Sequence, residues 1–272
     1  MLYLDAKAVR IPALGLGTWQ LSGRDCARIV EQAIRLGYRH FDTAQMYGNE
    51  REVGEGIRAS GIKREEVFVT TKVAPDNLAP GLLQRSVKDS VAALRLGEID
   101  LLLLHWPNKG VPLAETIDAL VGVKRDGLVR NIGVSNYTVA LLEEASGLSG
   151  DRLVCNQFEY HPYLDQSKVL AACRAHGMAA VAYSPIAKGS TKSDSVLARI
   201  GKTYGKTGAQ VSLRWLIQQG VGAIPRTSKV ERLAENIAIF DFALTDSEMQ
   251  DISGLARPDA RLVDWAWSPK WD

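Results

Sequence analysis

The amino-acid sequence predicts an α/β fold in which eight parallel strands alternate with helices and close into a (β/α)8 TIM barrel. Three observations support this: short apolar runs recur along the chain, helix-period segments lie between them, and no linker interrupts the 272 residues. Near-continuous apolar runs suit parallel strands that are buried on both faces better than half-exposed hairpins. The eight runs occupy residues 13–19, 40–44, 67–72, 99–106, 129–136, 154–160, 179–185 and 222–227.

The segments between these runs have the apolar periodicity of helices. In residues 82–96, Leu83, Val87, Val91 and Leu94 follow at spacings of four, four and three, which places them on one helical face. Further helices are predicted at residues 113–125, 138–147, 165–176, 208–219 and 229–238, with an extra helix at 194–205.

Two helix starts carry the spacing of a capping box. Asn49 precedes Glu52 by three residues, and Thr245 precedes Glu248 by the same interval. In such a box the first side chain accepts a hydrogen bond from the backbone of the third helical residue, whose own side chain reaches back. We therefore expect helices to begin after Asn49 and after Thr245.

The number of strand–helix units favours one of two parallel architectures. Eight strand–helix units without a linker favour a closed barrel, and an open doubly wound sheet remains the alternative from this pattern alone. The chain before the first strand has room for a short N-terminal β-hairpin. We predict a single domain over residues 1–272.

Composition excludes several classes of protein. A net charge of +2 without blocks of like charge argues against nucleic-acid binding, and no apolar run approaches the length of a membrane span. Three cysteines without Cys-x-x-Cys spacing, and the lack of a His-x-His pair, argue against a redox or metal site. We expect a cytoplasmic monomer that binds no membrane, no nucleic acid and no metal.

Polar residues at the ends of the predicted strands indicate the active site. In a barrel, catalytic side chains lie at the C-terminal ends of the strands. Asp42 and Tyr47 follow the second run, Lys72 ends the third, and His105 follows the fourth. Each alone has a structural explanation, such as a solvated lysine or a turn aspartate, but together they come from three consecutive strand ends.

These four residues form a chemically coherent set. A tyrosine has a pKa of about 10, and a neighbouring lysine cation lowers it by favouring the phenolate. Asp42 would keep a buried Lys72 charged, and His105 would donate a hydrogen bond to a substrate oxygen. Tyr47 would then act as a general acid toward an oxygen that gains negative charge, as carbonyl reduction requires.

Carbonyl reduction also needs a hydride donor, which no amino acid supplies, so a cofactor is implied. The segment "GLGTWQ" is no Rossmann fingerprint, because Gln20 stands where the third glycine belongs. A positive cluster offers another site for a phosphate: Arg226, Thr227 and Arg232 surround a predicted helix start, where backbone N–H groups favour anions.

The chain resembles the aldo-keto reductases over nearly its whole length. The resemblance is carried by "GLGTW" (15–19), "GYRHFDTAQMYGNE" (37–50), "TTK" (70–72), "LLLLHWP" (101–107), "IGVSN" (132–136), "NQFEYHP" (156–162), "YSPIAKG" (183–189) and "IPRTSKVERLAEN" (224–236). It implies NADPH-dependent reduction of aldehydes and ketones to alcohols. The family's catalytic tetrad falls on Asp42, Tyr47, Lys72 and His105.

The resemblance also implies the NADPH/NADP+ contacts. The carboxamide set matches Ser135, Asn136 and Gln157, and the stacking tyrosine matches Tyr183. Arg226 stands where the family usually has lysine. It keeps the positive charge that can bind the 2′-phosphate of NADPH, which NADH lacks. The other implied cofactor contacts are Thr18, Trp19, Ser184, Ile186, Thr227, Arg232, Glu235 and Asn236.

The implied substrate pocket is walled by Trp19, Met46 and Trp106, beside Tyr47 and His105. Trp265 and Trp267 near the C-terminus either wall this pocket or pack on the outer helices. Length and the ending "KWD" are similar to bacterial reductases, including the smaller B-type enzymes, that act on 2,5-diketo-gluconate, methylglyoxal and other small carbonyls. The functional alternatives are an NADPH-binding redox-sensing module with little turnover and a metal-dependent barrel hydrolase.

Overall fold

The computed structural model describes residues 2–272 and confirms the predicted barrel. Eight parallel strands form one sheet in the order β10-β9-β8-β7-β6-β5-β4-β3. The edges β3 and β10 meet through the bridges Leu14↔Ala223 and Gly17↔Arg226, which closes the sheet. The strands are β3 (Leu16–Gly17), β4 (His40–Asp42), β5 (Phe68–Val73), β6 (Ile99–Leu104), β7 (Val129–Ser135), β8 (Leu153–Glu159), β9 (Ala179–Tyr183) and β10 (Val221–Ala223).

Close packing around β3 explains the two glycines of "GLGTW". A Cβ on Gly17 would lie 2.7 Å from the carbonyl oxygen of Ile224, and one on Gly15 would lie 2.8 Å from the ring of His40. Both distances are shorter than side-chain contacts allow. These glycines therefore permit close approach of neighbouring segments. Their presence is explained by packing and needs no Rossmann motif.

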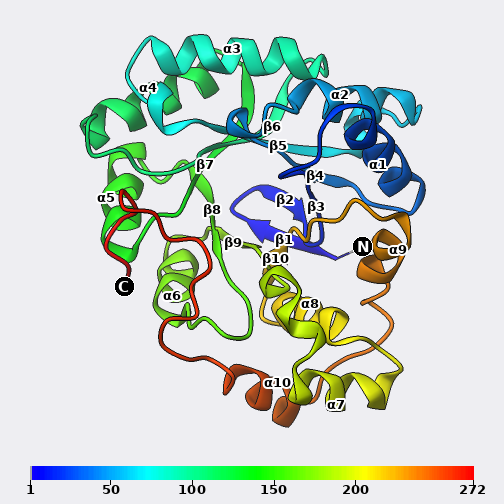
Figure 1. Ribbon diagram of the computed structural model, residues 1–272. Coiled ribbons are helices and arrows are strands. Elements are labelled where there is room, and N and C mark those ends of the chain that lie inside the picture. The colour runs from blue at the N-terminus through cyan, green and yellow to red at the C-terminus, as the bar shows by residue number, and fades with distance from the viewer. Residues whose placement is uncertain (1) are drawn as a thin grey trace.

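Helices surround the strands as an outer ring (Figure 1). They are α1 (Gly23–Arg35), α2 (Glu50–Ala59), α3 (Leu82–Leu94), α4 (Leu113–Arg125), α5 (Val139–Ser149), α6 (Ser167–Ala175), α7 (Ser195–Tyr204), α8 (Gly208–Gln218), α9 (Val230–Ile237) and α10 (Asp246–Ser253). Short 3-10 turns are η1 (Gln45–Tyr47), η2 (Arg64–Glu66), η3 (Pro75–Asn77) and η4 (Ala187–Lys192). All predicted helices are present, and α1 adds one that the sequence analysis did not single out.

The predicted N-terminal hairpin consists of β1 (Tyr3–Ala6) and β2 (Val9–Pro12), which pair antiparallel. In Figure 1 it lies across the middle of the ring. Leu4 and Ile11 of this hairpin are buried and belong to the main hydrophobic core. No helix within residues 2–272 is long and apolar enough to cross a membrane.

One of the two predicted capping boxes is wrong. Thr245 accepts a hydrogen bond from Glu248 N, and the Glu248 side chain accepts one from Thr245 N, so α10 begins as expected. Asn49 stands at the N-cap of α2 without any side-chain capping bond. Its side-chain amide is buried and bonds instead to Thr43 and to the carbonyl oxygens of Thr18 and Leu21.

Candidate active site

Three of the four predicted catalytic side chains are in direct contact. Lys72 Nζ lies 2.5 Å from Asp42 Oδ1 and donates a hydrogen bond of 3.2 Å to Tyr47 Oη. Adjacent strands β4 and β5 carry Asp42 and Lys72, and the short turn η1 carries Tyr47. Asp42 and Lys72 are almost fully buried, so their attraction is little screened by water.

Burial and neighbouring charges have opposite effects on the pKa values of Lys72 and Tyr47. Burial alone would lower the pKa of Lys72, but the charge and hydrogen bonds of Asp42 and Tyr47 outweigh it, and the pKa is raised. The pKa of Tyr47 is raised mainly by burial, and the opposing effect of Lys72 is smaller. The expected net lowering of the Tyr47 pKa is therefore wrong for the protein alone, and the phenol keeps its proton at neutral pH.

His105 is the fourth member and faces Tyr47 from the end of β6. The two rings meet edge to face with centroids 5.6 Å apart. Burial, helped by the charge of Lys72, lowers the pKa of His105 well below its usual value, so the ring is neutral. Its Nδ1 is buried and lacks a partner within residues 2–272. A neutral imidazole has one N–H to donate, which suits hydrogen bonding to a substrate oxygen.

Residues that the sequence analysis missed hold the loop of Tyr47 in place. Asn49 Oδ1 accepts a hydrogen bond from Thr43, and Asn49 Nδ2 donates to the carbonyl oxygens of Thr18 and Leu21. Gln45 Oε1 accepts hydrogen bonds from Ala74 N and from a nearby asparagine. Because these contacts join segments far apart in sequence, local spacing gives no signal for them.

A cluster of hydroxyl and amide groups lies beside this group, at the ends of β7, β8 and β9. Gln157 Nε2 donates to Asp42 Oδ2 over 2.7 Å. Asn136 Nδ2 donates to the carbonyl oxygen of His105 and to Ser135 Oγ, while Asn136 Oδ1 accepts from Tyr183 Oη. The structure thus brings together the four residues expected at the carboxamide and nicotinamide, and it connects them to the tetrad.

The expected phosphate-binding residues gather at the N-terminus of α9. Arg226 donates from Nε to the carbonyl oxygen of Trp19 and from Nη2 to that of Gln20, and no partner of its Nη1 is found within residues 2–272. Arg232 is exposed, and no hydrogen bond of its side chain is found within residues 2–272. Thr227 Oγ1 accepts from Lys229 N in the turn before the helix.

The remaining residues expected to contact the cofactor lie in α9, after β3 and before η4. Glu235 Oε1 accepts a hydrogen bond from Thr207, which turns this carboxylate toward α8, and Asn236 is buried nearby. Thr18 Oγ1 donates to the carbonyl oxygen of Asp42. Ser184 and Ile186 precede η4, where their carbonyl oxygens accept hydrogen bonds within the turn.

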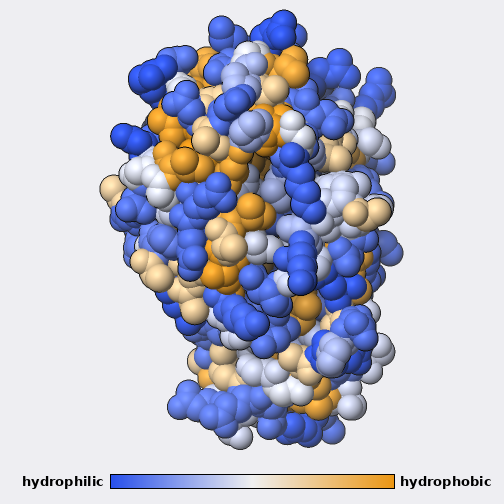
Figure 2. Space-filling view, turned by 90° about the vertical axis from the view of Figure 1, so that its left-hand side faces the viewer, coloured by the Kyte–Doolittle hydropathy of each residue, from blue (hydrophilic) through white to orange (hydrophobic). Residues whose placement is uncertain are grey.

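The three side chains expected to wall the substrate pocket differ in exposure. Trp19 and Met46 are about half exposed, whereas Trp106 is buried. Trp106 meets Trp267 edge to face at 5.1 Å and Trp271 at 6.0 Å. The C-terminal tail therefore covers Trp106 rather than packing its Trp267 ring on the outer helices. Figure 2 shows the side of the molecule with α5, α6 and the tail, where apolar surface gathers between hydrophilic residues.

Glu159 anchors the tail to the barrel. It is fully buried at the end of β8, and its carboxylate accepts hydrogen bonds from Leu262 N and Val263 N. His161 Nε2 lies 3.0 Å from the same carboxylate. Local spacing gives no signal for this role of Glu159, because Leu262 and Val263 lie about a hundred residues further along the chain.

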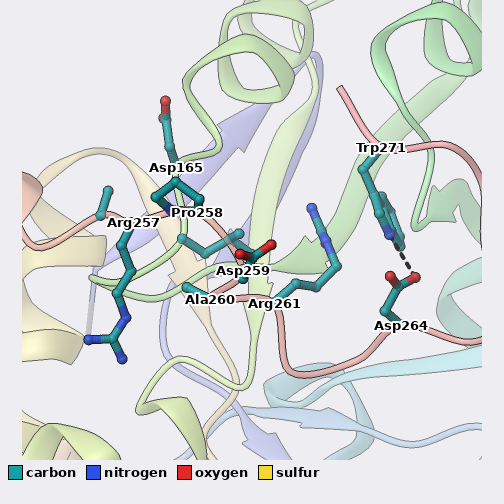
Figure 3. A pocket seen from close by; sticks show the side chains of 10 residues that line it. Asp165, Arg257, Pro258, Asp259, Ala260, Arg261, Asp264 and Trp271 are labelled. Atoms are coloured by element: carbon teal, nitrogen blue, oxygen red, sulfur yellow. Dashed lines mark hydrogen bonds between the residues drawn. The ribbon is translucent and has the colours of Figure 1, made fainter.

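A cavity of about 650 Å³ runs along the tail, away from the tetrad. Its walls include Arg257 and Arg261, but also Asp165, Asp259 and Asp264, so both signs of charge are present (Figure 3). Trp271 Nε1 donates to Asp264 at one end. None of the predicted site residues lines it. Within residues 2–272 no group of three metal-ligating side chains is present.

Comparison with known proteins relates the whole chain to one family. The sequence model of the Aldo/keto reductase family matches residues 13–257. The chain is 38% identical over 265 residues to methylglyoxal reductase DkgB of Salmonella typhi, covering 96% of this chain and 99% of that protein. It is 40% identical over 275 residues to morphine 6-dehydrogenase of Pseudomonas putida, covering 94% and 93%.

Among solved structures, one crystal structure superposes with a TM-score of 0.98 and 49% identity, covering 100% of this chain and 98% of that chain. It is of a protein proposed to be a 2,5-diketo-D-gluconic acid reductase B.

Proposed function

The chain belongs to the aldo/keto reductase family, a family of carbonyl reductases, and we propose that it uses NADPH as hydride donor and Tyr47 as proton donor. The observation that carries this proposal is the buried contact of Asp42, Lys72 and Tyr47 beside a neutral His105. Such a site offers the phenol proton of Tyr47 and a hydrogen-bond donor from His105 to one substrate oxygen.

The residues present fit a nicotinamide cofactor. A carboxamide has a donor NH₂ and an acceptor oxygen, which match the amide of Gln157 and the hydroxyl of Ser135. The ring of Tyr183 lies next to them, held by Asn136. At the other end, Arg226, Arg232 and the N-terminus of α9 suit a 2′-phosphate, which favours NADPH over NADH.

When bound, NADPH supplies a hydride to the carbonyl carbon. Tyr47 Oη donates its proton to the carbonyl oxygen as negative charge develops there, while His105 orients that oxygen. Lys72 stabilises the phenolate that remains, and Asp42 keeps Lys72 charged. Trp19, Met46 and Trp106 exclude water from one side and give the substrate an apolar surface.

We further propose small dicarbonyls, such as methylglyoxal and 2,5-diketo-gluconate, as substrates. Relatives that match nearly the whole chain carry these activities in their names. A mouth with one oxygen-binding pair and an apolar wall discriminates weakly among carbonyls, so we expect several to react. We also propose a single domain over residues 1–272, because one closed barrel carries all the residues assigned to the site, and we propose a monomer.

A panel of carbonyls tests this proposal. Purified protein is mixed with NADPH or NADH and with methylglyoxal, 2,5-diketo-gluconate or an aromatic aldehyde, and both nucleotide oxidation and alcohol product are measured. We expect alcohol formation with NADPH and a lower kcat/KM with NADH. Tight NADPH binding without product from any carbonyl would instead favour a redox-sensing module.

A further inference from the structure

Asp42 is held from both sides of the barrel. Its Oδ1 accepts from Lys72 on the neighbouring strand, and its Oδ2 accepts from Gln157 Nε2 over 2.7 Å. In the closed sheet, β4 and β8 are separated by three strands in either direction. The bond between Gln157 and Asp42 therefore spans the barrel mouth.

The chemistry of the two groups fixes how Gln157 is oriented. An ionised carboxylate only accepts hydrogen bonds, so the amide nitrogen must face Asp42. The amide oxygen is left as an acceptor, and no partner for it is found within residues 2–272. Gln157 is nearly fully buried and pairs in register with Ser135. One amide can therefore serve Asp42 and a bound carboxamide together.

Few charged groups surround the hydrogen bond between Gln157 and Asp42. The titratable groups that face Asp42, Lys72 and Tyr47 from the surrounding elements are His40, His105, Cys155 and Tyr183. Burial lowers the pKa of both histidines and raises the pKa of Cys155 and Tyr183 well above the usual values, so all four are neutral. Asp42 and Lys72 are left as the charged pair at the site.

A hydrogen bond to a buried carboxylate favours its charged form. Without Gln157, one oxygen of Asp42 would be buried without a hydrogen-bond partner, and the carboxylate would be free to turn away from Lys72. Such a turn weakens the attraction that holds the charge of Lys72 in place. The proton on Tyr47 would then be harder to release, because less positive charge would face the phenolate.

We propose that Gln157 is a positioning residue for proton transfer, which links the cofactor carboxamide to Asp42 and, through Lys72, to Tyr47. This inference rests on the proposed function and adds a second role to a residue expected only at the cofactor. It predicts that loss of the Gln157 amide changes the protonation behaviour of the site, beyond its effect on cofactor affinity.

The first test separates the two roles kinetically. Gln157→Met keeps length but removes the donor, and Ser135→Ala removes a carboxamide contact without touching Asp42. At saturating NADP+, the rate of alcohol oxidation rises with pH as Tyr47 ionises. We expect Gln157→Met to lower kcat about tenfold and to move this rise upward by about one pH unit. Ser135→Ala should weaken NADP+ binding but leave the rise at the pH of the wild type. Weaker cofactor binding with unchanged kcat and profile in Gln157→Met would overturn the proposal.

The second test needs no cofactor and no activity. In Gln157→Glu two carboxylates face each other, so one must hold a proton. The melting temperature of the protein alone should then fall as pH rises from about 5 to about 8, unlike that of the wild type. Exchanging the partners, Asp42→Asn with Gln157→Glu, should remove this dependence. A flat pH response in Gln157→Glu would contradict the contact, and it would do so even if no carbonyl were reduced.

Discussion

Lys72 Nζ lies 2.5 Å from Asp42 Oδ1, and each side chain is only 1% exposed. A pair buried this deeply contributes little net stability, but removal of one partner leaves an uncompensated charge. We expect Asp42→Asn to lower the free energy of unfolding by about 3–5 kcal/mol in urea denaturation. The double change Asp42→Asn with Lys72→Met should recover part of it. The control Asp25→Asn breaks an exposed pair with Arg28 and should have a far smaller effect. Equal losses in the single and double variants would contradict this account.

The pH dependence of carbonyl reduction should follow the protonation of the Tyr47 phenol. The active form of Tyr47 carries its proton, and burial raises the pKa of this group above its usual value of 10. The active fraction is therefore complete at neutral pH and is lost only as pH rises through that raised value. We expect kcat/KM for reduction to stay flat from about pH 6 to about pH 9 and to fall above about pH 10. His105 is neutral throughout because its pKa is well below 6.5, so an inflection near that pH would count against its assigned state.

Coenzyme preference should depend on Arg232. Its guanidinium is exposed at the start of α9 and makes no hydrogen bond within residues 2–272. A bond from a charged donor to a phosphate contributes about 1.5–3 kcal/mol, so Arg232→Ala should weaken NADPH binding about tenfold or more. Binding of NADH, which lacks the 2′-phosphate, should hardly change. Arg125→Ala, an exposed arginine on α4, is the control for loss of charge alone. A parallel loss for NADPH and NADH would place the phosphate elsewhere.

The tail should contribute to substrate binding through Trp267. This ring contacts Trp106 next to the tetrad, and Glu159 fixes the chain just before it. We expect Trp267→Ala and removal of residues 265–272 to raise KM about tenfold for bulky carbonyls. Glu159→Gln should loosen the tail, detected as faster proteolysis near residue 262, whereas the exposed Glu143→Gln should not. Unchanged KM for every carbonyl after removal of the tail would exclude this role.

Local sequence patterns were sufficient to predict the eight strands, every helix except α1, and the strand ends that carry Asp42, Lys72 and His105. Buried parallel strands need nearly continuous apolar runs, and all eight were visible for that reason. Asp42, Lys72 and His105 stand at ends of these runs, where barrel geometry brings them together. The helix α1 also carried a signal, since Cys26, Ile29, Val30, Ala33 and Ile34 lie on one buried face.

Contacts between distant segments could not be predicted from spacing. Asn49 and Thr245 have the same capping pattern, but only Thr245 caps its helix, because the buried Asn49 bonds to Thr18, Leu21 and Thr43 instead. The net pKa of Tyr47 depends on how far burial outweighs Lys72, which requires the three-dimensional structure.

The most direct test of the central claim is the rate of NADPH oxidation with methylglyoxal in the wild type and in Tyr47→Phe, together with NADPH affinity. Phenylalanine keeps the ring beside Lys72 and removes only the hydroxyl that would donate the proton. We predict that kcat falls by a factor of about 10² to 10⁴ while the Kd for NADPH stays close to that of the wild type. Turnover at the wild-type rate in Tyr47→Phe would contradict the assignment of Tyr47 as the proton donor.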